Sequence, residues 1–487
     1  MLDAFQEILN RGLATMYGMK PSEIALDANG HSPWDDAWDV YKRFVIDAPK
    51  SAKAAKKDAV EAAWGPFHRA QKGESPAGGL GNRRIVRRAV AHKYVIFSDH
   101  HITFPGHRHY GTWGANLDLY CTALQAYFAN GYVLVENGDV EELVIYEPSI
   151  RYDHPKPEPE IRAALTTMGQ LNQRRRQTRK LQLRWILGDA AHAPLLQRWK
   201  DFANATIPGT HHSRLIRVAG NHDYNLQTSD GYLGLYHDAG VTLDKPVDYL
   251  VIGPQQQRPF VVMHGHQFDK ASNPTSGKRF GETISECLGV YYQGADRTWA
   301  AGETRKWRDG THRFLNDLVS DDPGSWVGNL DAALFESLFQ HNIAWDYFEN
   351  YGDPAKAMKL EALAGKRWIK FRHMDERYIW RHLNNYPKQR RPKLVLGHSH
   401  EVRAHPRAPT GAKLVDCYFN SGSAGRFEKL VWGLEIVGGV ATVVSWAEMD
   451  DGTIERREWN PDKQHYPGFA AKRGVLEPGP TSGLNVP

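Results

Sequence analysis

The chain has 487 residues, of which 41% are hydrophobic and 11% aromatic, so it can bury a large core and general disorder is excluded. Its net charge of +5 permits a local site for an anionic substrate but does not by itself indicate nucleic-acid binding. The three cysteines include no CxxC pair, which excludes a disulfide scaffold and a zinc finger. With no signal-peptide pattern and no long apolar run, we expect a cytoplasmic protein without a transmembrane segment.

Residues 1–80 are predicted to form an N-terminal helical extension followed by a linker. Apolar residues recur at three- and four-residue intervals in 37–48 (AWDVYKRFVIDA) and 51–64 (SAKAAKKDAVEAAW), as on one face of a helix. The Gly/Pro/Ser-rich stretch 71–84 (QKGESPAGGLGNRR) then marks the clearest boundary in the chain.

Short aliphatic runs follow, and each ends in a cluster of small or polar residues. They are KYVIFSD (93–99), GYVLVENGD (131–139), RLIRVAGN (214–221), PFVVMHG (259–265) and KLVLGHS (393–399). Strand pattern returns in 413–423 and 433–447. Strand-like runs separated by helical stretches predict a layered α/β core with ligands at the strand ends.

The core is predicted to occupy 85–269, with an insert at about 150–205, and to resume at 391–460. Between these parts, 270–390 is mostly helical in pattern and holds six of the fifteen tryptophans, which indicates a packed helical insert. The last stretch, 461–487, is rich in Gly and Pro and is predicted to be disordered.

The ends of the five runs carry side chains of the kind that bind metals. In chain order they are Asp99, His101, Asp139, Glu142, Asn221, His222, Asp223, His264, His398 and His400. Two divalent ions side by side can clamp a phosphoryl group and lower the pKa of water toward neutrality. Imidazole mixed with carboxylate and amide oxygens suits manganese, with iron or zinc as alternatives.

The motif set resembles the calcineurin-like metallophosphoesterases. The chain has D-x-H at 99–101, GD-x-x-E at 138–142, GNHD at 220–223, a strand ending in His264, and GH-x-H at 397–400. The resemblance implies a four-layer αββα sandwich, with the 270–390 insert as a helical lid and the N-terminal extension outside the family core. It also implies hydrolysis of phosphomonoesters, phosphodiesters or pyrophosphates by a hydroxide that bridges two metals.

The same resemblance assigns roles to individual residues. The first metal would be held by Asp99, His101, Asp139 and His400. The second would share Asp139 and take Asn221, His264 and His398, so that the two histidines of GH-x-H serve different ions. His222 matches the proton donor near the leaving group, Glu142 would orient it, and Asp223 is a third catalytic candidate.

The substrate class follows from departures within the motifs. The chain reads GDVEELV where the family's protein phosphatases have GD-x-x-DRG, so a phosphoprotein substrate is disfavoured. GD-x-x-E, HGHQFD and the helical insert are similar to the branch that contains UDP-2,3-diacylglucosamine hydrolases. This similarity implies a phosphorylated small-molecule or lipid-linked substrate.

Two other functions stay open at this point. A nuclease would use the basic stretch of Arg174, Arg175, Arg176, Arg179 and Lys180 to grip phosphates. A non-catalytic scaffold is disfavoured because no ligand position of the motif set is vacant. His100 is predicted to point away from the metals, and His266 to lie beside the site in a supporting or structural role. The sequence identifies neither the substrate, the native metals nor the oligomeric state.

Overall fold

A computed structural model describes residues 85–103, 113–144, 179–228, 230–254, 257–268, 383, 387–400, 402–404, 417–425, 429–449, 451–460 and 475–478. The predicted extension at 1–80 and nearly all of the 270–390 insert lie outside these ranges. The chain divides into two compact units. Every candidate ligand belongs to the unit formed by Ala63–Glu142, Leu183–His266 and Glu376–Pro487.

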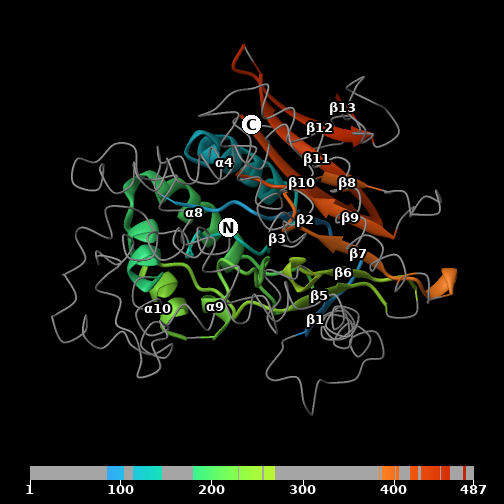
Figure 1. The fold of residues 1–487 in the computed structure, drawn as a ribbon, viewed down its shortest axis with the longest axis horizontal. Coiled ribbons are helices and arrows are strands. Elements are labelled where there is room, and N and C mark those ends of the chain that lie inside the picture. The colour runs from blue at the N-terminus through green and yellow to red at the C-terminus, as the bar shows by residue number, and fades with distance from the viewer. Residues whose placement is uncertain are drawn as a thin grey trace, which may run out of the picture. The chain divides into compact units, whose positions relative to one another are not determined.

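One mixed sheet of seven strands carries the first three motifs (Figure 1). Its order is β13 (Val475–Pro478), β12 (Ile454–Asn460), β11 (Val440–Glu448), β10 (Leu430–Val437), β2 (Tyr94–Phe97), β3 (Val133–Asn137) and β4 (Leu215–Val218). Strands β2, β3 and β4 run parallel, whereas the pairs from β13 to β2 are antiparallel. The parallel part therefore brings three consecutive motif-bearing strand ends to one edge.

A second mixed sheet of six strands carries the last two motifs. Its order is β1 (Ile85–Arg88), β5 (Tyr249–Ile252), β6 (Phe260–Val262), β7 (Lys393–Leu396), β9 (Tyr418–Ser421) and β8 (Val402–Ala404). Strand β7 lies parallel to β6 and β9, so the ends of β6 and β7 are also neighbours.

The two sheets face each other across one apolar core. Alternate residues of β2, Tyr94 and Ile96, enter this core and meet residues of the other sheet such as Leu250 and Val262. The opposite face of β2 is covered as well, because Phe97 packs edge-on against Tyr120 of helix α4 (Trp113–Ala129). Burial on both faces explains why β2 is a continuous apolar run instead of an alternating one.

Helix α8 (Ala193–Asn204) packs against α4 and β4 (Figure 1). A proline in its first turn favours initiation, and its buried residues recur at helical spacing: Leu195, Leu196, Trp199 and Phe202. The predicted insert at about 150–205 therefore extends too far, because its last part belongs to the core. The 3-10 turn η3 (Ala190–His192) precedes α8, and α9 (Asn225–Thr228) and α10 (Asp230–Asp238) follow β4. The other short turns are η4 (His266–Phe268) and η5 (Lys388–Arg390).

The structure confirms a mixed α/β fold, and it differs from the predicted bounds of both the insert and the tail. Each of the five motif-bearing runs contains a strand that ends just before its motif. Within the tail predicted to be disordered, residues 475–478 form β13, which pairs with β12, with Leu476 opposite Trp459. Pairing supplied by an existing sheet edge outweighs the Gly/Pro composition that the prediction relied on. No helix within the described ranges has the length and apolar character to cross a membrane.

Candidate metal centre

The motif loops are tied together by backbone hydrogen bonds. Asp99 N–H donates to the Gly138 carbonyl at 3.1 Å, and His101 N–H donates to that of Asp139 at 3.0 Å. Across the sheets, His398 N–H donates to Asp99 Oδ2 at 2.8 Å. The loops after β2, β3 and β7 therefore form one rigid edge on which side chains from both sheets converge.

Several candidate ligands sit in a backbone conformation that L-residues seldom adopt. The described part of the chain has seven non-glycine residues with positive φ, and five of them are candidate ligands. They are Asp99, His101, Asp139, His398 and His400, with φ between 50° and 65°. Each such residue costs about 1–3 kcal/mol, and such strain clusters at functional sites. The concentration of strained residues marks this edge as a candidate site independently of side-chain chemistry.

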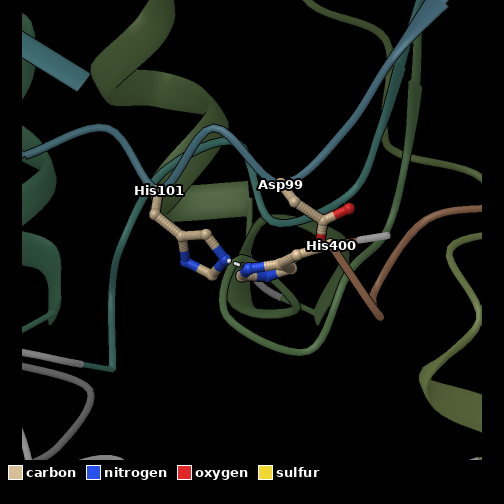
Figure 2. Close-up of side chains that lie close together, drawn as sticks. All are labelled: Asp99, His101 and His400. Atoms are coloured by element: carbon tan, nitrogen blue, oxygen red, sulfur yellow. Dashed lines mark hydrogen bonds and ion pairs between the residues drawn. The ribbon is translucent and has the colours of Figure 1, made fainter. Parts of the chain in front are cut away.

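The first ligand group consists of Asp99, His101 and His400, whose side chains converge (Figure 2). His400 Nε2 lies 3.3 Å from Asp99 Oδ1 and 3.1 Å from His101 Nε2. Ligand atoms held about 2.1 Å from one ion at tetrahedral angles lie roughly 3.4 Å apart. The three buried side chains thus have separations that suit a single coordinated cation.

The second group consists of Asp139, His264 and His398. His264 Nε2 lies 3.0 Å from Asp139 Oδ2 and 3.2 Å from Asn221 Oδ1, so the amide joins this group. His264 Nδ1 contacts the Asn137 carbonyl at 2.8 Å, which directs Nε2 toward the ligands. His264 Nε2 also lies 3.9 Å from Asp99 Oδ1, so the two groups are adjacent.

Glu142 joins the first ligand group to the predicted proton donor. Its Oε2 lies 2.8 Å from His101 Nδ1, and its Oε1 lies 2.8 Å from His222 Nδ1. The His101 and His222 rings meet edge to face, with centroids 4.7 Å apart. One buried carboxylate thus orients both rings, and these three residues form a third group that could hold a metal ion.

The electrostatics of the site favour a cation. Burial alone would lower the pKa of His264, but the Asp139 and Asp99 carboxylates outweigh it and raise that pKa to about 10. Burial likewise opposes ionisation of Asp99, yet His264 and His400 hold its pKa at about 2. Burial is also outweighed at His222, where Glu142 and Asp139 raise the pKa to about 9. Buried carboxylates therefore draw positive charge to this site, and a divalent ion could supply it.

Asp223 belongs to neither ligand group. Its Oδ1 accepts the Gly220 N–H at 2.7 Å, and its Oδ2 accepts the Val140 N–H at 3.1 Å. Burial raises its pKa to about 6, although Arg217 nearby lowers it. These contacts hold two loops together, and the predicted catalytic role of Asp223 stays a prediction.

Two other histidines lie near the groups without joining them. His100 turns away, as predicted, and its Nε2 contacts Glu136 Oε2 at 2.8 Å. The His266 ring lies beside those of His264 and His398, at 5.4 Å and 6.3 Å between centroids.

Sequence reasoning missed three buried residues beneath the ligands: Arg217, Glu141 and Tyr236. The sequence did contain a signal for Arg217, because this residue interrupts the otherwise apolar strand LIRV. A charged residue inside a buried run requires a buried partner of opposite charge.

The donor set fits divalent metals, since it combines imidazole, carboxylate and amide oxygen. Within the described residues, the groups around Asp99, Asp139 and Glu142 could each hold an ion. A comparison with protein-family models and a comparison with curated proteins both found no match to the chain. The site's chemistry therefore has to be argued from its own residues.

Proposed function

We propose that the chain is a dinuclear metal-dependent hydrolase of phosphoester bonds, built on a four-layer αββα sandwich. One observation carries this proposal: two ligand groups lie next to each other, with His264 between the Asp139 and Asp99 carboxylates. The two facing sheets, with α4 and α8 packed on one of them, are compatible with such a sandwich.

The ligands divide between two ions with Asp139 shared. Asp99, His101 and His400 would hold the first, and Asn221, His264 and His398 the second. When bound, two divalent ions would stabilise charge on a phosphoryl group and supply a nucleophile from water at neutral pH. The separation of His398 from His400 into different groups supports this division.

The remaining residues would handle protons. The pKa of His222, raised to about 9, leaves its imidazole protonated at neutral pH in the metal-free site. Because Glu142 engages Nδ1, the ring would donate from Nε2 to the oxygen of the leaving group. Glu142 would orient this donor and the ligand His101 together.

A phosphorylated small molecule or lipid-linked phosphate is the proposed substrate class. Of the basic residues that would favour a nuclease, Arg174, Arg175 and Arg176 lie outside the described residues, and Arg179 is buried. No described contact therefore favours nucleic acid over a smaller phosphoester.

The test is metal-dependent turnover of p-nitrophenyl phosphate and bis-p-nitrophenyl phosphate by protein loaded with Mn²⁺. We expect turnover of at least one substrate, and its loss in Asp139→Asn and His264→Ala. His192→Ala is the matched control, because His192 is also a buried histidine but belongs to none of the ligand groups. It precedes α8 and contacts the Ile186 carbonyl. Folded wild-type protein without metal-dependent turnover of either substrate would contradict the proposal.

A further inference from the structure

Arg217 is a buried cation that contacts two loops of the candidate metal centre. It lies on β4, three residues before the GNHD loop, and its side chain is 2% exposed. Its guanidinium carbon lies 5.6 Å from the centre of the Trp199 ring and 5.8 Å from that of Tyr236. A charge in such surroundings is stable only with partners of opposite charge.

Its partners are two carboxylates from different motif loops. Arg217 Nη2 lies 2.5 Å from Glu141 Oε2 in the GDVEE loop and 3.6 Å from Asp223 Oδ2 in the GNHD loop. The Tyr236 hydroxyl donates to the other oxygen of Glu141. One guanidinium group therefore ties the loop after β3 to the loop after β4.

The connection continues to the candidate ligands. Asp223 accepts N–H groups from both loops, at Gly220 and Val140. With the GNHD loop held in this way, His222 N–H donates to Asp139 Oδ1 at 2.8 Å. The same loop places Asn221 Oδ1 at 3.2 Å from His264 Nε2. The positions of Asp139 and Asn221 thus depend on how firmly these loops are joined.

We propose that Arg217 is a positioning residue for the metal centre, acting through Asp223 and Glu141 to fix the two loops that carry Asp139 and Asn221. This inference rests on the proposed function for the identity of the centre.

Besides its backbone bonds to the loop after β3, the first ligand group has supports that lie outside the loops after β3 and β4. Asp99 Oδ2 accepts the His398 N–H, and the Asp99 carbonyl accepts the Ser423 hydroxyl at 2.6 Å. Neither bond involves Arg217. Loss of Arg217 should therefore affect the ion that Asn221 helps to hold more than the ion at Asp99 and His400. A general loss of stability would not distinguish between two ions.

The test compares Mn²⁺ binding to Arg217→Met, Arg217→Lys and wild-type protein by calorimetry and by the paramagnetic resonance signal of the bound ions. In Arg217→Met we expect one of the two binding steps to weaken by about 10- to 100-fold, a typical loss for a group that supports metal ligands. The other step should weaken by a smaller factor, because the two ions share Asp139 but only one of them is held by Asn221. Arg217→Lys keeps a cation near both carboxylates and should recover part of the lost affinity.

The matched control is Arg456→Met. Arg456 has a side chain 4% exposed and makes two 2.8 Å bonds to Glu435 on β10, away from the motif loops. The Arg456→Met protein should lose a comparable amount of folding stability and should keep both Mn²⁺-binding steps. If Arg217→Met does not fold, Tyr236→Phe removes the donor to Glu141 with little change in volume. It should shift the same binding step by a smaller factor.

The inference is overturned if the foldable variants at 217 and 236 bind both ions like wild type, or if Arg456→Met weakens the same step equally. Two ions bound with no turnover, together with the selective loss in Arg217→Met, would support the inference and contradict the proposed hydrolase alone. Metal-dependent turnover that Arg217→Met leaves unchanged, with both ions bound, would contradict the inference alone.

Discussion

Replacing Gly397 by alanine tests how tightly the GH-x-H loop is built against the first ligand group. A Cβ at this position would lie 2.6 Å from Asp99 Oδ2 and 2.5 Å from Ser98 Oγ, whereas ordinary contact begins at 3.4 Å. Neither neighbour can swing away freely. Asp99 Oδ2 accepts the His398 N–H at 2.8 Å, and Ser98 Oγ is hydrogen-bonded to Ser421 Oγ at 2.8 Å.

The size of the effect follows from these distances. To reach ordinary contact, the Asp99 carboxylate or the loop must move by about 0.8 Å. A misplacement near 1 Å can cost about 100-fold in rate, or roughly 2.7 kcal/mol of transition-state stabilisation. We therefore expect Gly397→Ala to lower kcat/KM for bis-p-nitrophenyl phosphate by about that factor, with weaker Mn²⁺ binding. Overpacking should also cost about 1–3 kcal/mol of folding stability.

Gly234→Ala is the control for this substitution. Gly234 lies within α10, and a Cβ there would meet nothing within 4 Å. Alanine at this site should stabilise the fold by up to about 1 kcal/mol and leave turnover unchanged. A Gly397→Ala protein with wild-type Mn²⁺ affinity and wild-type kcat/KM would refute the reasoning from crowding.

Three further predictions concern charge and packing. Glu142→Gln should lower kcat by about 10- to 100-fold, because the substitution weakens the contacts that orient His101 and His222. Two Mn²⁺ ions should still bind, and an unchanged kcat would contradict the orienting role of Glu142. Because the pKa of His264 is raised to about 10, protonated His264 stabilises the metal-free fold. This contribution to the free energy of unfolding should be complete below about pH 6.5 and should be lost as pH rises through about 10, as denaturation at a series of pH values would show. Over the same range Mn²⁺ must displace the His264 proton, so calorimetry in buffers of different ionisation enthalpy should detect its release, with affinity rising with pH. Leu250→Ala should lower the free energy of unfolding, measured by urea denaturation, by about 2–5 kcal/mol, because this side chain is fully buried between the sheets. The number of ions bound should not change.

The strands that carry the motifs could be predicted from sequence because both of their faces are buried. Strand β2 (YVIF) is an uninterrupted apolar run, and the polar residues of its motif begin directly after it. The pattern was sufficient to place Asp99 and Asp139 at strand ends, and the parallel pairing of β2 with β3 in the structure makes these ends neighbours. How the second sheet, with β6 and β7, packs on the first depends on contacts between distant parts of the chain, which no local pattern encodes.

Strand β12 illustrates what local patterns could not predict. Its sequence IERREWN is largely charged, yet Arg456 points inward and pairs with Glu435 of β10. The rule that inward positions are apolar fails wherever an ion pair is buried. Arg217 was missed for the same reason, since its partners Glu141 and Asp223 come from other parts of the chain.

The positions of the ligand side chains also required the structure. Positive φ at His398 and His400 turns residues two apart in sequence toward different groups. An extended segment would have placed both on the same side. The proposed division between two ions, expected from the family resemblance, would therefore depend on a strained loop instead of a regular strand.

The most direct measurement is anomalous diffraction from crystals loaded with Mn²⁺. We expect two peaks about 3.5–4 Å apart with Asp139 between them. His400 should coordinate one ion and His398 the other. A single peak, or one ion bound by both His398 and His400, would contradict the proposed two-ion site.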